Sequence, residues 1–244
     1  MRWPSRQGPE VTREELRAAG HDVGAAAYAR LAEFVRLLME ENARLNLTAA
    51  KTAAEIWRGH VCDSLALAGL VSERRVQALL DLGSGGGLPG VPVACVCEGV
   101  RVTLLDATRK KVDAAARMIA RLGLSNATAL WGRAEVRAHA PAYRERFDAV
   151  TSRAVAELPV LLEYAAGFVR SGGECWFFKS AARAAEERAA AQAAAAMCVL
   201  EYVGALSYRL PDEADARVVL RYRKSGVLRA DLPRAPGRAR KRPL

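Results

Sequence analysis

The sequence predicts an α/β fold with a mostly parallel sheet, and three features lead to this expectation. Short apolar runs alternate with helical segments through the middle of the chain, which is typical of a doubly wound parallel sheet. A glycine-rich turn from Gly83 to Gly87 follows the first of these runs. Two late strand-like segments, 199–206 and 217–222, are suited to antiparallel pairing at one edge of the sheet.

The first part of the chain is predicted to be a helical extension. Thr12 and Thr52 each precede a glutamate by three residues, the spacing of a capping box at a helix start. Between them, apolar residues recur at three- and four-residue spacing, at Tyr28, Leu31, Val35, Leu38, Met39 and Leu45. A second apolar arc follows Thr52 and ends near Gly69. We therefore expect helices from residue 12 to about residue 72.

The sheet is predicted from five apolar runs, at 76–82, 101–105, 127–131, 147–151 and 175–178. Helices are predicted between and after them, at 92–97, 109–122, 158–169 and 181–196. Gly123 and the Gly172–Gly173 pair are read as helix stops. The expected organisation is an N-terminal extension at 1–75, a central domain at 76–224 and a basic tail at 225–244.

The charge of the chain favours a polyanionic partner. The formal net charge is +10, and basic proteins attract nucleic acids by steering and counterion release. One acid, Asp231, stands in the tail against six cations, which are Arg229, Arg234, Arg238, Arg240, Lys241 and Arg242. Prolines and glycines interrupt this segment, so we expect an extended arm, either bound to nucleic acid or solvated without a partner.

Composition argues against several other classes. No run of eighteen apolar residues is present, and Met1 to Glu10 do not resemble a signal peptide. The five cysteines form no CxxC pair, and the three histidines are scattered, so we expect reduced thiols and no metal site. These features together predict a cytoplasmic protein that does not enter a membrane.

The glycine turn predicts a cofactor site at the end of a strand. Gly83, Gly85 and Gly87 match the turn of S-adenosylmethionine (SAM) enzymes, whereas Gly85, Gly87 and Gly90 match the dinucleotide fingerprint. Asp81 lies at the strand end, where its carboxylate would oppose a diphosphate but would suit a cationic ligand. SAM is therefore favoured, with a dinucleotide as the alternative.

Two further strand ends supply candidate cofactor ligands. Asp106 follows the second strand, 23 residues after Gly83, where an acid can accept hydrogen bonds from ribose hydroxyls; the alternative is a cap for the helix beginning near Arg109. After the third strand, the backbone at Ala134 and the side chain of Glu135 are placed to contact an adenine, unless this segment is only a polar loop.

The end of the fourth strand bears on the chemistry. It contains Arg153 but neither an Asn/Asp-Pro-Pro-aromatic turn nor a cysteine beside a proline, so neither amine nor pyrimidine-carbon methylation is indicated. An acceptor that needs no activation fits better, such as N7 of guanine, whose lone pair is free. Arg153 would then position a phosphate, a base edge or a cofactor carboxylate, and the alternative is a bridge to an acid such as Glu157.

Motifs in order along the chain resemble one family. They are Leu45–Ala49, His60–Leu65, the glycine turn continuing to Pro92, Leu104–Asp106 with Lys110–Val112, Gly132–Glu135, Ser152–Ala156 and the final Arg-Lys-Arg-Pro-Leu. Together they resemble the bacterial small-subunit ribosomal RNA guanine-N7 methyltransferases, also called glucose-inhibited division protein B. The resemblance spans about residues 28 to 180, and Lys179-Ser180 departs from the Lys-Gly common in the family.

The resemblance implies a Rossmann-like class I SAM-dependent methyltransferase fold, with a helical extension, acting on a guanine of 16S ribosomal RNA or of the small subunit. Its implied cofactor ligands, including the glycine turn, are Gly83, Gly85, Gly87, Leu88, Asp106, Ala134, Glu135 and Arg153. Residues implied near the substrate are Asn46, His60, Asp63 and Ser64, with Lys179 and Arg153 as RNA contacts. His60 could equally be a core histidine, and Lys179 could simply end the sheet edge.

No general base is expected, because N7 of guanine loses no proton on methylation. A monomer is expected. The competing hypotheses are a dinucleotide-dependent oxidoreductase and a SAM-sensing RNA-binding protein without catalysis.

Overall fold

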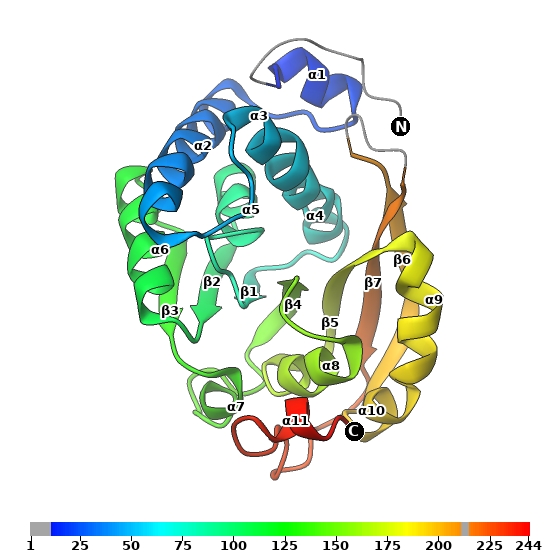
Figure 1. Cartoon of the computed structure of the whole chain (residues 1–244). Helices are drawn as coiled ribbons and strands as arrows, with labels where there is room; N and C mark the ends of the chain where they lie inside the picture. Colours follow the sequence, from blue (N-terminus) through cyan, green and yellow to red (C-terminus); the bar gives the residue numbers. More distant parts are fainter. Residues whose placement is uncertain (1–10, 211–214) are drawn as a thin grey trace.

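A computed structural model describes residues 11–210 and 215–244 of the chain (Figure 1). Its centre is a seven-stranded sheet of order β3-β2-β1-β4-β5-β7-β6. The strands are β1 (Ala78–Leu82), β2 (Arg101–Asp106), β3 (Ala127–Trp131), β4 (Phe147–Arg153), β5 (Val169–Ser180), β6 (Leu200–Tyr208) and β7 (Arg217–Lys224). Strands β1 to β5 are parallel, and β7 pairs antiparallel with both β5 and β6. The predicted parallel sheet with an antiparallel edge is confirmed.

Helices cover both faces of this sheet. The first five helical segments are α1 (Arg13–Ala18), α2 (Ala25–Leu45), α3 (Ala53–Ile56), a π-helical turn η1 (Trp57–Val61) and α4 (Cys62–Glu73). The others are α5 (Gly90–Val96), α6 (Arg109–Arg121), α7 (Ala134–Arg137), α8 (Leu158–Ala166), α9 (Ala181–Ala190), α10 (Gln192–Met197) and α11 (Arg238–Lys241). Within the described residues, no helix combines the length and apolar character needed to cross a membrane.

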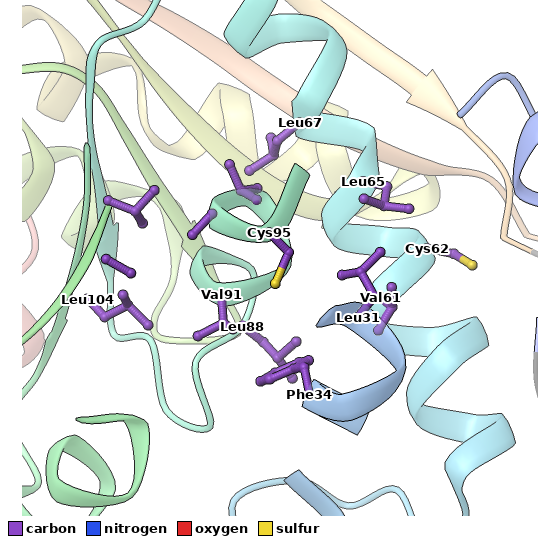
Figure 2. Close-up of a cluster of buried hydrophobic side chains, with 14 of the residues drawn as sticks. Leu31, Phe34, Val61, Cys62, Leu65, Leu67, Leu88, Val91, Cys95 and Leu104 are labelled. Carbon is purple, nitrogen blue, oxygen red and sulfur yellow. The ribbon is translucent and has the colours of Figure 1, made fainter. Parts of the chain in front are cut away.

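The N-terminal helices share a hydrophobic core with one face of the sheet. Phe34 of α2 and Leu65 of α4 belong to the same buried cluster as Val91 of α5 and Leu104 of β2. Figure 2 shows these side chains converging around α5. Because burial of this apolar surface stabilises both parts at once, the extension holds a fixed position beside the carboxyl end of β1. The predicted capping box at Thr12 is present in full.

Strand β5 corrects one predicted boundary. The sequence suggests a helix up to Val169 with Gly172–Gly173 as its stop, but α8 ends at Ala166 and both glycines lie inside β5. The pairing with β4 is irregular between Phe147 and Ala149, which indicates a bulge. A Cβ on Gly173 would lie 2.6 Å from the carbonyl oxygen of Asp148. These glycines therefore permit close strand contact instead of ending a helix.

The basic tail corrects a second expectation. Residues 225–244 pack against the sheet domain, with Leu228, Leu232 and Ala239 buried in the cluster on the second face, so the predicted extended arm is wrong. The short helix α11 lies against α8 (Figure 1). Burial of these three apolar side chains, which are spaced among the cations, contributes to holding the segment in place. Residues 1–10, where no signal peptide is predicted, lie outside the described residues.

Candidate active site

A cavity of about 800 Å³ opens at the carboxyl ends of the parallel strands. Its walls include Leu82 at the end of β1, Asp106 at the end of β2 and Arg153 at the end of β4. The strand order reverses between β1 and β4, and ligands of open α/β sheets bind at such a switch point. A volume of this size suits a nucleoside-sized cofactor with room for part of a second molecule.

The glycine turn forms the floor of this cavity. The amide of Gly83 donates to the carbonyl of Leu105 at 2.8 Å, which ties the turn to β2. The φ angle of Gly83 is +77°, and an added Cβ would lie 2.3 Å from the side chain of Val155, so only glycine fits. Gly85 also lines the cavity, whereas Gly87 does not. Gly87 lets the turn pack on Val91, which its Cβ would approach to 2.7 Å.

Asp81 lies behind the turn instead of facing the cavity. Its side chain is fully buried, and its Oδ2 accepts a hydrogen bond from the amide of Gly90 at 2.8 Å. Its Oδ1 has no hydrogen-bond partner among the described residues. Burial raises the pKa of Asp81 to about 7. A Cβ on Gly90 would lie 2.8 Å from the same Oδ2, so Gly90 is explained by close packing without a diphosphate.

Asp106 joins the glycine turn to the start of α6. Its Oδ2 accepts from the amide of Gly85 at 3.0 Å, and its Oδ1 accepts from the amide of Thr108 at 2.8 Å. The N-cap position of α6 is held by Thr108, whose side chain makes no capping hydrogen bond, so the alternative of Asp106 as the N-cap residue is wrong. Each carboxylate oxygen has a second lone pair, and Asp106 lines the cavity. It can therefore accept a hydroxyl of a ligand while fixing the turn.

Ala134 and Glu135 begin α7 and form the wall next to β3. Glu135 is 6% exposed. Its Oε1 accepts from the hydroxyl of Tyr164 at 3.1 Å and from the amide of Gly237 at 2.9 Å. Burial, and then the charge of Glu135, raises the pKa of Tyr164 to about 12, so the phenol remains a donor. The carboxylate is held in one orientation by residues far away in sequence.

Arg153 enters the cavity from β4 and is held by a buried acid. Its Nη1 lies 2.8 Å from Oδ2 of Asp63 and also donates to the carbonyl of Gly59 at 3.3 Å. The acid that pairs with Arg153 is Asp63 of α4 and not Glu157. Oδ1 of Asp63 accepts from the hydroxyl of Tyr208, and Arg217 lies 3.3 Å from it. One carboxylate thus places two guanidinium groups that both line the cavity.

The sequence left two interpretations of His60 open, a core histidine with bonded ring nitrogens or a residue at the substrate pocket. The structure shows features of both. His60 is half-buried and lines the cavity, with its Nε2 2.5 Å from the hydroxyl of Thr48. Burial, followed by the positive charge of Arg153, lowers the pKa of His60 to about 4. The imidazole is therefore neutral at pH 7 and serves as a hydrogen-bonding group.

Four other predicted residues lie outside the cavity lining, which are Asn46, Asp63, Ser64 and Lys179. Asp63 reaches the cavity only through Arg153 and Arg217, and Ser64 is buried, with its hydroxyl donating to the carbonyl of His60 at 2.7 Å. Asn46 is exposed and ends α2 in a left-handed conformation with φ of 50°. Lys179 is paired, since its Nζ lies 2.5 Å from Oε2 of Glu187. The structure brings Leu88 and the other predicted cofactor residues except Gly87 to one cavity.

Sequence reasoning missed several lining residues, which are Ser84, Thr108, Lys111, Tyr164, Arg217, Gly237 and Arg240. Ser84 follows the end of β1, and Thr108 and Lys111 follow the end of β2. Their nearness in sequence to the predicted ligands Gly83 and Asp106 is the signal that marks them. Tyr164 lies in an apolar helical run, and Gly237 and Arg240 lie in the presumed arm. No local signal marks these three, because only tertiary packing brings them to the cavity.

The sheet order, the glycine turn after β1 and the acid at the end of β2 define a Rossmann-like class I methyltransferase fold. An O-methyltransferase from Bacillus cereus, solved in complex with SAH, superposes with a TM-score of 0.56 at 20% identity. The match covers 78% of this chain and 90% of that one. This likeness establishes the fold.

Sequence comparison then gives the family. The family model for rRNA small subunit methyltransferase G matches residues 27–209. Ribosomal RNA small subunit methyltransferase G of Pelotomaculum thermopropionicum is 34% identical over 96% of this chain and 98% of its own length. The protein of the same name from Deinococcus radiodurans is 37% identical over 95% and 92%. The chain belongs to the rRNA small subunit methyltransferase G family.

Proposed function

We propose that this protein transfers a methyl group from SAM to N7 of a guanine in 16S ribosomal RNA. The observation that carries the proposal is the cavity at the switch point, where the glycine turn, Asp106, Ala134, Glu135 and Arg153 meet. Its support from sequence is the family membership, since the relatives bear the name of an rRNA methyltransferase.

The residues present fit such a cofactor. At Gly85, which lines the cavity, an added Cβ would meet no atom within 4 Å, so the glycine leaves open space in which a ligand can lie directly on main-chain atoms. The carboxylate of Asp106 can accept hydrogen bonds from the ribose hydroxyls of the cofactor. Ala134 and Glu135 lie where they would contact its adenine. SAM, when bound there, supplies an electrophilic methyl group on a sulfonium. Arg153 is the cation placed to bind a carboxylate or a phosphate.

The proposed methyl transfer requires little general acid–base catalysis from the protein. N7 of guanine carries a free lone pair, so no proton has to leave before attack. The histidine in the cavity, His60, is neutral, and burial lowers its pKa to about 4, which suits a hydrogen-bond role. Rate enhancement would come from holding the two reactants in line and keeping water out. Arg153 and Asp63 supply a fixed group for this positioning.

The charge of the cavity favours an RNA acceptor. Five cations line it, against the two acids Asp106 and Glu135; the cations are Lys111, Arg133, Arg153, Arg217 and Arg240. A phosphate backbone would gain from this excess, and binding would weaken with salt. We propose that His60 and Arg153 approach the substrate, with 16S rRNA or the small subunit as partner, and that the enzyme acts as a cytoplasmic monomer. Asn46 and Lys179 are proposed only as outer RNA contacts.

The test is methyl transfer to small-subunit RNA from a strain that lacks this modification. The protein is incubated with tritium-labelled SAM and either free 16S rRNA or whole subunits. We expect label in the RNA, and strand scission at one guanine after borohydride and aniline treatment. Binding of SAH without any transfer would instead indicate a SAM sensor. Thermal stabilisation by NAD and not by SAH would indicate an oxidoreductase.

A further inference from the structure

The C-terminal segment forms part of the cavity wall. Gly237 and Arg240 line the cavity together with the glycine turn and Glu135. In Figure 1 this part of the chain passes below α7 and α8 and forms α11 shortly before the C-terminus. The backbone at Gly237 is left-handed, with φ of +79°, and this turn directs its amide to the carboxylate of Glu135 at 2.9 Å. The segment thus reaches a residue of the proposed cofactor site directly.

Three contacts anchor the segment just before Gly237. Oε2 of Glu163, a fully buried carboxylate, lies 2.5 Å from the guanidinium of Arg234, and Oε1 accepts from the Arg234 amide at 2.7 Å. The ring of His139 lies 2.8 Å from the carbonyl oxygen of Pro233. Arg144 donates to the carbonyl of Leu232 at 3.0 Å. A charge-assisted, doubly bonded pair at a buried site is a strong attachment, so the segment is held at a defined position.

A second contact leads from the segment to the glycine turn. Nη2 of Arg240 donates to the carbonyl of Val155 at 3.3 Å. The side chain of Val155 packs where a Cβ on Gly83 would lie, at a separation of 2.3 Å. The segment therefore touches both walls of the cavity, one through Glu135 and the other through Val155.

We propose that residues 234–240 belong to the cofactor-binding site, with Gly237 and Tyr164 positioning Glu135, and that docking of this segment is coupled to binding of an adenosyl ligand. The inference rests on the proposed function, because it takes the cavity as the SAM site. A ligand that contacts Glu135 in this orientation stabilises the docked segment, and by linkage the docked segment strengthens ligand binding.

The first experiment measures SAH affinity by calorimetry for the full chain and its variants. Tyr164→Phe removes one donor to Glu135, and we expect about fivefold weaker binding, the effect of one net hydrogen bond. Arg234→Gln removes the ion pair with Glu163, and we expect SAH to bind about tenfold more weakly or worse. Arg234→Lys keeps the charge and should restore part of the affinity. Arg242→Gln, at an exposed position, is the charge-matched control and should bind as the wild type.

The second experiment tests coupling in the unaltered protein. Trypsin cleavage after Arg238 and Arg240 is followed by mass spectrometry with and without SAH, with cleavage after Arg183 on α9 as the internal reference. SAH should slow cleavage in the C-terminal segment several-fold more than at Arg183. Equal protection at both places, or unchanged affinity in folded Tyr164→Phe and Arg234→Gln variants, would overturn the inference. If wild-type protein does not bind SAH at all, the proposed function itself fails.

Discussion

The carboxylate of Asp63 lies 2.8 Å from the guanidinium of Arg153, although 90 residues separate the two in sequence. Asp63 is fully buried in α4, and Arg153 ends β4 at the cavity. The contact makes the N-terminal helices part of the site, because the acid of the extension fixes a cation of the sheet domain.

Replacing Asp63 by Asn tests this relationship. The variant leaves Arg153 and Arg217 without their shared counter-ion, and breaking a buried pair typically costs about 3 kcal/mol of stability or more. We expect a lower urea midpoint and about tenfold weaker SAH binding, since Arg153 loses its fixed orientation. Asp113→Asn, at an exposed pair with Arg109, should change both by little. Wild-type affinity in a folded Asp63→Asn protein would remove the extension from the site.

Two glycines of the same turn are predicted to respond differently. In Gly83→Ala the new Cβ would lie 2.3 Å from the side chain of Val155, so the substitution should destabilise the fold by about 2 kcal/mol or more. Gly85 has open space around a Cβ and lines the cavity, but its φ of +54° strains any other residue by about 1 kcal/mol. Gly85→Asp should therefore cost less stability than Gly83→Ala yet abolish SAH binding. Thermal melts and calorimetry on both proteins separate these effects. Retained affinity in Gly85→Asp would exclude the turn from the site.

His60 predicts a loss of stability in acid. Burial lowers its pKa to about 4 in the folded protein, whereas the unfolded value is about 6.5. The unfolded chain binds more protons between these values, so the free energy of unfolding falls as the pH drops from about 6.5 to 4. The effect is about 3 kcal/mol at most. Denaturant titrations at pH 6.5 and pH 4 should show a smaller loss of unfolding free energy in His60→Gln than in the wild type. Equal losses in the two proteins would contradict a lowered pKa of His60.

Asp81 predicts the opposite slope in nearly the same range. Burial raises its pKa from 3.8 to about 7, so the folded protein binds more protons between these values. The free energy of unfolding therefore decreases as the pH rises toward 7, and it levels off above 7. Asp81→Asn lacks this titration. Between pH 4.5 and 7.5 the wild type should lose stability relative to Asp81→Asn, and parallel curves would show that Asp81 stays ionised.

Local patterns were sufficient for the sheet but not for the walls of the cavity. Apolar runs that alternate with helical segments predicted β1 to β4, and the glycine or charged residue at the end of a run predicted the positions of Gly83, Asp106 and Arg153. The boundary of β5 was missed because Gly172 and Gly173 resemble a helix stop, while their role is close strand contact. Local sequence does not encode which strand a glycine will approach.

The C-terminal segment was misread for a related reason. Cations among prolines and glycines indicate an arm when only composition is considered. The anchors Leu228, Leu232 and Ala239 are few, and the partner of Arg234 is Glu163, 71 residues away. Asp63 was likewise placed near the site only through a family resemblance, since no spacing rule links it with Arg153. Long-range pairs of this kind depend on the packed fold.

The most direct test of the account is a crystal structure of the full-length protein grown with SAH. The account predicts density for the ligand in the cavity of about 800 Å³, with its ribose at Asp106, its adenine beside Ala134 and Glu135, and its amino-acid end toward Arg153. An empty cavity at saturating SAH, or ligand bound elsewhere on the molecule, would contradict it.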